Sequence, residues 1–302
     1  MSINSRSNGA LAIVFASLLW GTTGTVAHFA SNVSPLAIGA FAMGFGGIFL
    51  CANAAKSLVH DLSKMRKMPV ILVAGSICVA VYPLAFYTSM RWSGVTIGTV
   101  VSIASAPLFS VILERLFCQK PFSWKWGVSF VLGAGGVLLL SSGKTSREVI
   151  EMDTHLQQIG VCLGLVAGLT YAGYSLAVKS MINSGVNSRS AMAGLFGLAA
   201  LILLPSLFVT GENLFVSAGN TIVALYMAII PMFFGYLLYG YGLRSIDASK
   251  ATLITLIEPL IAALLAVWIL DETFRPIGWL GMMLVCACLL IQSVKIESRA
   301  SS

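Results

Sequence analysis

Charge is what this sequence has least of. Only 10% of its 302 residues are charged, whereas 58% are hydrophobic and the mean hydropathy is +0.92. A soluble domain carries about 25% charged residues, because its surface must face water. This scarcity excludes a soluble globular protein, and much of the outer surface must therefore face lipid.

The sequence also lacks the motifs of several enzyme and cofactor classes. Its six cysteines and three histidines form no CxxC pair and no zinc-like spacing. Gly143-Lys144-Thr145 resembles the end of a phosphate-binding loop, but Leu138 stands where that loop requires glycine. No apolar segment holds a central histidine or a pair of carboxylates. We therefore expect no enzyme activity, no metal or other cofactor, and no ATP binding.

Ten apolar segments are long enough to cross the hydrocarbon core of a membrane, which takes about 20 helical residues. They are 9–29, 35–53, 69–90, 94–115, 124–140, 156–178, 190–210, 220–243, 249–270 and 276–294. The connections are short, and the longest, 54–68 and 141–155, are predicted to be polar loops. The predicted fold class is all-α: a polytopic membrane protein with ten transmembrane helices.

The basic residues are distributed unequally between the two sides of the membrane. With the N-terminus inside, 14 of the 18 Lys and Arg residues fall on the cytoplasmic side. The other four are Arg91, Lys144, Arg147 and Arg275. This is the pattern of the positive-inside rule, which predicts that both termini are cytoplasmic. The net charge of +7 is thus explained by basic residues that set the orientation in the membrane, and no nucleic-acid partner is expected.

The two halves of the chain resemble each other. Residues 87–122 align without gaps against 239–274, and three identical pairs match: Tyr87 with Tyr239, Pro107 with Pro259, and Phe122 with Phe274. Because each half has five spans, an odd number, the second copy is inserted upside down. We predict a cytoplasmic N-terminus at 1–8, a first five-helix repeat at 9–140, an external loop at 141–155, an inverted second repeat at 156–294 and a cytoplasmic C-terminus at 295–302.

One carboxylate, that of Glu258, lies deep inside a predicted span. A charge there is costly unless it is paired, hydrated or protonated, so Glu258 is a candidate for binding a substrate ammonium group or a proton. The alternative is a protonated side chain with a structural hydrogen bond beside the Pro259 kink. No Lys or Arg lies near the middle of a predicted span, which disfavours phosphorylated and other anionic solutes. The substrate is expected to be neutral, zwitterionic or cationic.

Aromatic residues gather near the middle of the spans. Tyr and Trp at this depth avoid lipid, and their ring faces attract ammonium groups. We predict a central substrate-binding site lined by Trp20, Tyr82, Phe86, Tyr174, Tyr239 and Glu258. For any single aromatic residue, ordinary helix packing is the alternative. Four prolines, two in each half, are predicted to kink or hinge their helices: Pro83, Pro107, Pro231 and Pro259.

Several short motifs resemble those of the EamA family in the drug/metabolite transporter superfamily, and within it the amino-acid exporter branch. They are Leu19-Trp20-Gly21-Thr22, the Ala106-Pro107 and Glu258-Pro259 steps, and Asp271-Glu272 before a glycine-rich last helix. The family usually has an acidic residue 13 positions after each proline. Glu272 fits this pattern, whereas Lys120 departs from it in the first half.

These features predict a secondary transporter of the bacterial inner membrane that exports small metabolites, chiefly amino acids including aromatic ones, by alternating access. The alternative is a multidrug exporter of hydrophobic cations. An intramembrane enzyme lacks a catalytic constellation here, and the inverted repeat favours alternating access over a passive channel. The expected partners are the lipid bilayer and a small-molecule substrate.

Overall fold

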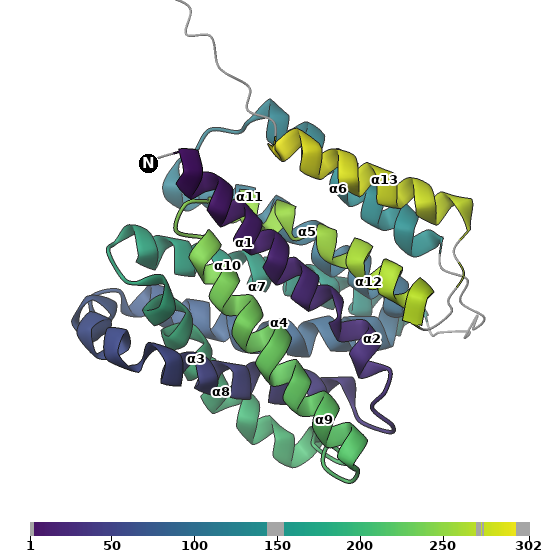
Figure 1. Ribbon diagram of the computed structural model, residues 1–302, viewed down its shortest axis with the longest axis horizontal. Helices are drawn as coiled ribbons and strands as arrows, with labels where there is room; N and C mark the ends of the chain where they lie inside the picture. Colours follow the sequence, from purple (N-terminus) through teal and green to yellow (C-terminus); the bar gives the residue numbers. More distant parts are fainter. Residues whose placement is uncertain (1–2, 144–153, 270–272, 274, 294–302) are drawn as a thin grey trace, which may run out of the picture.

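The computed structural model describes residues 3–143, 154–269, 273 and 275–293, and every regular element within them is a helix (Figure 1). The first half of the chain forms α1 (Ile3–Gly21), α2 (Thr23–Ala27), α3 (Pro35–Arg66), α4 (Pro69–Ser93), α5 (Val95–Cys118) and α6 (Trp124–Ser142). The second half forms α7 (Thr154–Asn183), α8 (Ser188–Thr210), α9 (Ala218–Met227), the π-helix η1 (Ala228–Gly235), α10 (Tyr236–Gly242), α11 (Ala248–Ile254), α12 (Ile257–Ile269) and α13 (Pro276–Ser293). The predicted all-α class is confirmed.

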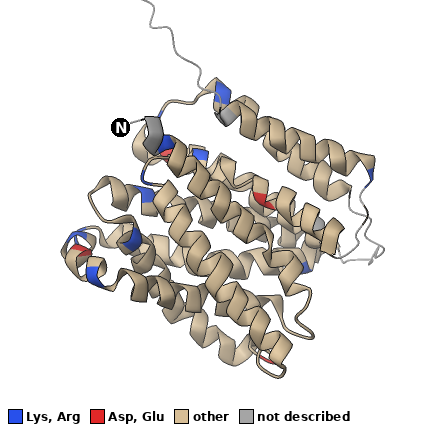
Figure 2. Ribbon diagram, viewed as in Figure 1, with Lys and Arg blue, Asp and Glu red and all other residues tan. Residues whose placement is uncertain are grey.

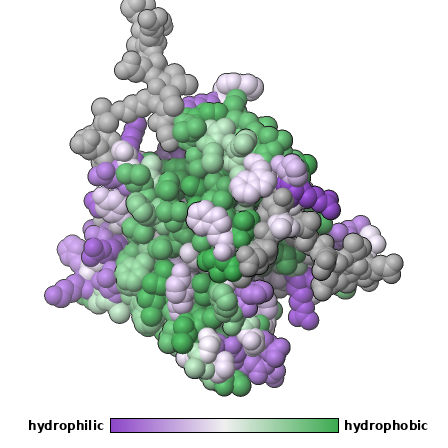
Figure 3. Space-filling model, turned by 45° about the vertical axis from the view of Figure 1, so that its right-hand side comes forward, coloured by the Kyte–Doolittle hydropathy of each residue, from purple (hydrophilic) through white to green (hydrophobic). Residues whose placement is uncertain are grey.

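The exterior of the bundle is apolar between its two ends. Among the described residues, 9 helical segments are long and apolar enough to cross a membrane, and a shorter apolar helix covers Pro276–Ile291. Charged residues lie mostly toward the ends of the helices (Figure 2), and the face drawn in Figure 3 is largely hydrophobic. Large side chains such as Phe208 and Trp268 are 95% and 78% exposed. Such a surface faces lipid, which confirms a polytopic membrane protein.

The long helices run between two ends of the bundle. We call the end at which α1 begins the amino end; the loops 119–123 and 243–247 lie there. The opposite end, called the far end, holds the loop 28–34 and the corner at Gly94. Gly94 alone connects α4 to α5, and its φ of +86° is a conformation that residues with a Cβ adopt at a cost.

Helix α3 is longer than predicted. The expected loop at 54–68 is wrong, because the helix continues to Arg66 and α4 begins at Pro69. Polar contacts stabilise the additional helical turns. Because these turns are not apolar, a search of the sequence for apolar runs does not detect them. Lys64 Nζ lies 2.8 Å from Asp61 Oδ1, and Asp61 Oδ2 accepts a hydrogen bond from the Asn187 backbone N–H at 2.9 Å. Most of the other predicted loop, 141–155, lies outside the described residues.

Two spans in the second half are irregular, each near a proline. The span from Ala248 to Ile269 is divided between α11 and α12. Pro259 has no N–H to donate to Thr255 O, and the N–H of Glu258 donates to that oxygen at 2.9 Å instead. The preceding span contains the π-helical turns of η1 around Pro231. By contrast, α4 and α5 run without a break through their prolines.

Three helix pairs pack most extensively: α3 with α8, α4 with α7, and α6 with α13. Glycine permits the close approach in each of them, as the last two pairs illustrate. A Cβ on Gly160 of α7 would lie 2.6 Å from the Ser93 backbone nitrogen, and one on Gly136 of α6 would lie 2.8 Å from Gly281 O of α13. The α6/α13 pair lies beside the other helices (Figure 1), which surround the centre of the bundle.

Candidate functional site

A cavity lies within the bundle, nearer its far end. The lining comes from both halves of the chain and consists of Trp20, Thr23, Gly39, Met43, Tyr82, Pro83, Phe86, Tyr87, Tyr171, Tyr174, Met232, Tyr236 and Glu258. Its volume is about 50 Å³, which is space for only a few water molecules. A solute of amino-acid size therefore requires the surrounding helices to move apart.

Aromatic rings form most of the cavity wall and contact one another. Tyr82 stacks on Phe86 with ring centroids 5.7 Å apart, and Tyr171 stacks on Tyr174 at 5.2 Å. The rings of Tyr82 and Tyr171 are 5.6 Å apart, which joins α4 to α7. Trp20 of α1 contacts the second half of the chain, and its ring centroid lies 4.9 Å from that of Tyr236. The wall is therefore continuous across both halves of the chain.

Several polar atoms behind these rings have protein partners. The indole N–H of Trp20 donates to Pro231 O at 2.9 Å, a carbonyl within the π-helical turns. The Tyr171 hydroxyl donates to Thr255 Oγ1 at 3.0 Å, and the hydroxyls of Tyr174 and Tyr236 lie 3.1 Å apart. These bonds fix the orientation of the rings, since buried polar groups without partners are costly.

Three polar groups on the wall are different. Within the described part of the chain, the Glu258 carboxylate and the hydroxyls of Tyr82 and Tyr87 form no hydrogen bond or ion pair. No Lys, Arg or His among the described residues lines the cavity. A carboxylate accepts hydrogen bonds from an ammonium group, and phenol hydroxyls can donate to a carboxylate or a carbonyl. The cavity wall therefore offers one carboxylate and two phenol hydroxyls as hydrogen-bonding groups.

Local backbone features bring these groups to the cavity. Glu258 follows the break between α11 and α12, and its neighbour Pro259 accounts for that break. Helix α1 approaches closely at Gly21, where a Cβ would lie 3.1 Å from Glu258 O. Gly39 of α3 leaves room for the ring of Tyr87, whose Cδ2 would lie 2.8 Å from a Cβ at that position.

The structure brings five of the six predicted binding residues to this one cavity: Trp20, Tyr82, Phe86, Tyr174 and Glu258. Tyr239 is instead fully buried beside it. The Tyr239 ring lies 5.3 Å from that of Trp20, and its hydroxyl donates to Ser175 Oγ at 2.9 Å. In the part of the chain that the structure describes, no group of three or more His, Cys, Asp or Glu side chains could hold a metal ion.

Sequence reasoning missed several lining residues. Tyr87 carries a signal, because it aligns with Tyr239 in the predicted internal repeat, but this alignment does not show which helix face points inward. Tyr171 and Tyr236 are also aromatic residues near the middle of predicted spans, but the prediction of the site did not include them. Gly39 has no sequence signal, because its role depends on the ring that packs against it from another helix.

Comparisons with known proteins agree with this architecture. The profile of the EamA-like transporter family matches the chain twice, at residues 7–142 and 158–294. The uncharacterized transporter YwfM of Bacillus subtilis is 32% identical over 285 residues, which cover 94% of this chain and 93% of that protein. A solved crystal structure with 15% identity superposes with a TM-score of 0.79 over 95% of this chain and 96% of its own, and therefore shares the fold.

Two more distant relatives are named uncharacterized inner membrane transporters. YicL of Salmonella typhimurium is 22% identical over 99% of each chain, and YedA of Escherichia coli K12 is 24% identical over 94% of this chain and 89% of its own. These names indicate a multi-pass membrane transporter and not an enzyme. With both halves matched by one profile and a relative at 32% identity along nearly the full length, the chain belongs to the EamA-like transporter family.

Proposed function

We propose that this transporter exports small amine-bearing metabolites, chiefly amino acids including aromatic ones, across the bacterial inner membrane. The observation that carries the proposal is the Glu258 carboxylate, which has no partner in the described structure and lies among aromatic rings with no basic residue in the lining. An ammonium group would bind this carboxylate and lie against the ring faces. The free hydroxyls of Tyr82 and Tyr87 would donate to the carboxylate of the same amino acid.

The transport cycle that we propose is alternating access between two inverted five-helix repeats, 9–140 and 156–294. Two matches of one family profile support the repeats. The packing supports the inversion: α4 packs on α7, and correspondingly η1 and α10 pack on α1, as a two-fold axis in the membrane plane requires. The same axis relates α3 to α8 and α6 to α13, which pack on each other. Pro83, Pro107, Pro231 and Pro259 would be the hinges.

For the orientation, we propose that the amino end faces the cytoplasm and that 141–155 is external. The positive-inside distribution supports this, and the relatives YicL and YedA are named inner membrane transporters. In a background without the six native cysteines, Ser142→Cys should be labelled by an impermeant thiol reagent on intact cells, because Ser142 is exposed where α6 ends.

The matched control for this labelling is Ser184→Cys, an exposed position just after α7 at the amino end. It should react only after the cells are opened. Labelling of Ser184→Cys on intact cells, with Ser142→Cys protected, would contradict the orientation.

Counterflow in proteoliposomes tests the substrate class. Vesicles preloaded with an unlabelled solute should accumulate labelled neutral amino acids, aromatic ones among them, and should not accumulate sugar phosphates or dicarboxylates. The reason is that the described lining offers one carboxylate and no basic side chain. Counterflow of anionic solutes alone would contradict this prediction.

A second candidate function is the export of hydrophobic cations. The aromatic wall favours it, since Tyr82, Phe86, Tyr171 and Tyr174 present adjoining ring faces that attract cations. Hydrophobic cations carry no carboxylate, so the site need not supply a hydrogen-bond donor for one. Counterflow of cationic dyes without counterflow of amino acids would select this function.

A further inference from the structure

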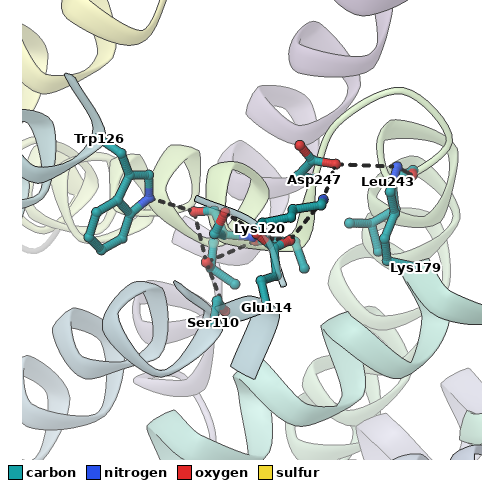
Figure 4. Close-up of polar contacts among 10 residues, drawn as sticks. Ser110, Glu114, Lys120, Trp126, Lys179, Leu243 and Asp247 are labelled. Atoms are coloured by element: carbon teal, nitrogen blue, oxygen red, sulfur yellow. Dashed lines mark hydrogen bonds and ion pairs between the residues drawn. The ribbon is translucent and has the colours of Figure 1, made fainter. Parts of the chain in front are cut away.

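A network of charged side chains lies at the amino end of the bundle, and Figure 4 shows its contacts. Lys120 Nζ lies 2.7 Å from Asp247 Oδ1 and 3.7 Å from Glu114 Oε1, and Lys179 Nζ lies 4.0 Å from Asp247 Oδ1. Glu114 and Lys120 come from α5 and the loop after it, whereas Lys179 is on α7 and Asp247 precedes α11. The network therefore joins the first half of the chain to the second.

Further contacts hold Glu114 and Lys179 in a buried environment, whereas the side chains of Lys120 and Asp247 are 35% and 40% exposed. Glu114 and Lys179 are only 4% and 7% exposed. Ser249 Oγ donates to Glu114 Oε2 at 2.6 Å, and Lys179 Nζ donates to Leu243 O at 2.8 Å. Burial alone would raise the pKa of Asp247, but the hydrogen bond and charge of Lys120 hold that pKa below its ordinary value. Asp247 is therefore ionised at neutral pH and paired with Lys120.

A stripe of polar side chains leads from this network toward the cavity. Ser249, Thr252 and Thr255 follow one another at intervals of three, so they share a helix face, and Glu258 continues the series across the break. Partners on other helices contact the stripe: Thr252 Oγ1 donates to Ser110 Oγ at 3.1 Å. The last hydroxyl, that of Thr255, accepts a hydrogen bond from Tyr171, which lines the cavity.

Apolar side chains packed between the two halves at the amino end would close it at a lower cost in free energy; we call the contact surface between the halves at this end the seam. Charges lose their hydration on burial, and replacing buried ion pairs by packed apolar side chains is often neutral or stabilising. A polar seam has a different advantage: when its two sides separate, each charge and each hydroxyl can hydrogen-bond to water. The closed and open forms of such a seam then differ less in free energy than those of an apolar seam.

We propose that the polar face formed by Ser249, Thr252 and Thr255 is the wall of the path by which the solute reaches Glu258 from the cytoplasm. Glu114, Lys120, Lys179 and Asp247 are the gate that closes this path in the present conformation. The proposal rests on the alternating-access function and the orientation proposed above. It extends them, because it assigns the access path and its gate to particular residues.

Cysteine accessibility tests the path without a substrate. Thr252→Cys is made in the cysteine-free background, and inside-out vesicles are treated with a positively charged, impermeant methanethiosulfonate reagent. Asp247→Asn breaks the ion pair, so the open form gains population and labelling should accelerate by about tenfold, which corresponds to a shift of about 1.4 kcal/mol. The double variant Lys120→Asp/Asp247→Lys restores a pair of opposite charges and should return the labelling rate toward the original value.

Two controls define the result. Arg115→Gln removes a positive charge next to Glu114 and should leave the rate unchanged, since Arg115 forms no ion pair within the described part of the chain. Ser184→Cys is exposed in the closed form and should label at the same rapid rate in every variant. If Asp247→Asn does not fold, Glu114→Gln removes charge from the same network and carries the same expectation.

An unchanged labelling rate at Thr252→Cys in the folded gate variants would overturn the proposal, and so would faster labelling from the external side in right-side-out vesicles. The outcome is separate from the substrate question. Accelerated labelling together with absent amino-acid counterflow would refute the proposed substrate class and leave the gate in place.

Discussion

Glu258→Gln is expected to lower the rate of amino-acid counterflow by at least about tenfold while the protein remains folded. A hydrogen bond to a charged group contributes about 1.5–3 kcal/mol, and each 1.4 kcal/mol corresponds to a factor of ten. Gln preserves the shape and the hydrogen-bonding capacity of the side chain but cannot ionise, so the variant isolates the charge. The measurement is the initial rate of counterflow in proteoliposomes that contain equal amounts of folded protein.

The control for this prediction is Glu212→Gln, which removes an exposed carboxylate from the far-end loop after α8 and should leave the rate unchanged. Two further observations separate the possible roles of Glu258. A selective loss of amine-bearing solutes indicates direct binding, whereas a pH dependence that disappears in the variant indicates proton uptake. Transport at the original rate with unchanged pH dependence would show that Glu258 is structural.

Gly136→Leu is expected to destabilise the protein strongly, because it separates α6 from α13. A Cβ at Gly136 would lie 2.8 Å from Gly281 O and 2.9 Å from the Val285 backbone nitrogen. Backbone atoms cannot move aside as the end of a flexible side chain can, so the two helices must shift. Overpacking of this kind costs about 1–3 kcal/mol and occasionally more. Thermal unfolding in detergent should show a lower apparent melting temperature and a smaller folded yield.

Gly135 offers a matched control on the same helix. Apart from its chain neighbours and the backbone of its own helix, no described atom lies within 4 Å of a Cβ built at this position, so Gly135→Leu should unfold near the temperature of the unaltered protein. Both variants add the same side chain to the same turn, and only the packing differs. Equal melting temperatures for the two variants would contradict the close approach of α6 and α13.

The arrangement of helices was predictable to different degrees in different regions. Each span can be recognised from its own sequence, because about 20 successive apolar residues are needed to cross the bilayer. Polar residues mark the connections between spans. The same criterion failed for α3. Its last turns are charged and continue as a helix because Asp61 and Lys64 bond to each other and Asp61 bonds to the backbone of Asn187. Contacts between segments distant in sequence leave no trace in a hydropathy pattern.

The candidate site shows the same division. Glu258 was identifiable because a carboxylate at that depth is costly and therefore rare. The aromatic residues were identifiable as a group, but Tyr239 proved to be buried behind Trp20, whereas Tyr87 lines the cavity. The direction of each ring depends on how its helix is rotated against its neighbours. Glu114 was not recognised as a buried carboxylate at all, because it lies near the end of its span.

The sequence by itself determined that this is an all-helical, polytopic membrane protein, because the bilayer constrains the composition of every segment separately. It also identified Glu258 as the carboxylate placed deep in a span. Only the tertiary structure decided which groups meet. Within the described residues, the hydroxyls of Tyr82 and Tyr87 lie at the same cavity as Glu258 and form no hydrogen bond, and Lys120 pairs with Asp247. Such contacts depend on the packing of helices that are far apart in the chain. This packing follows from the simultaneous fit of many side chains.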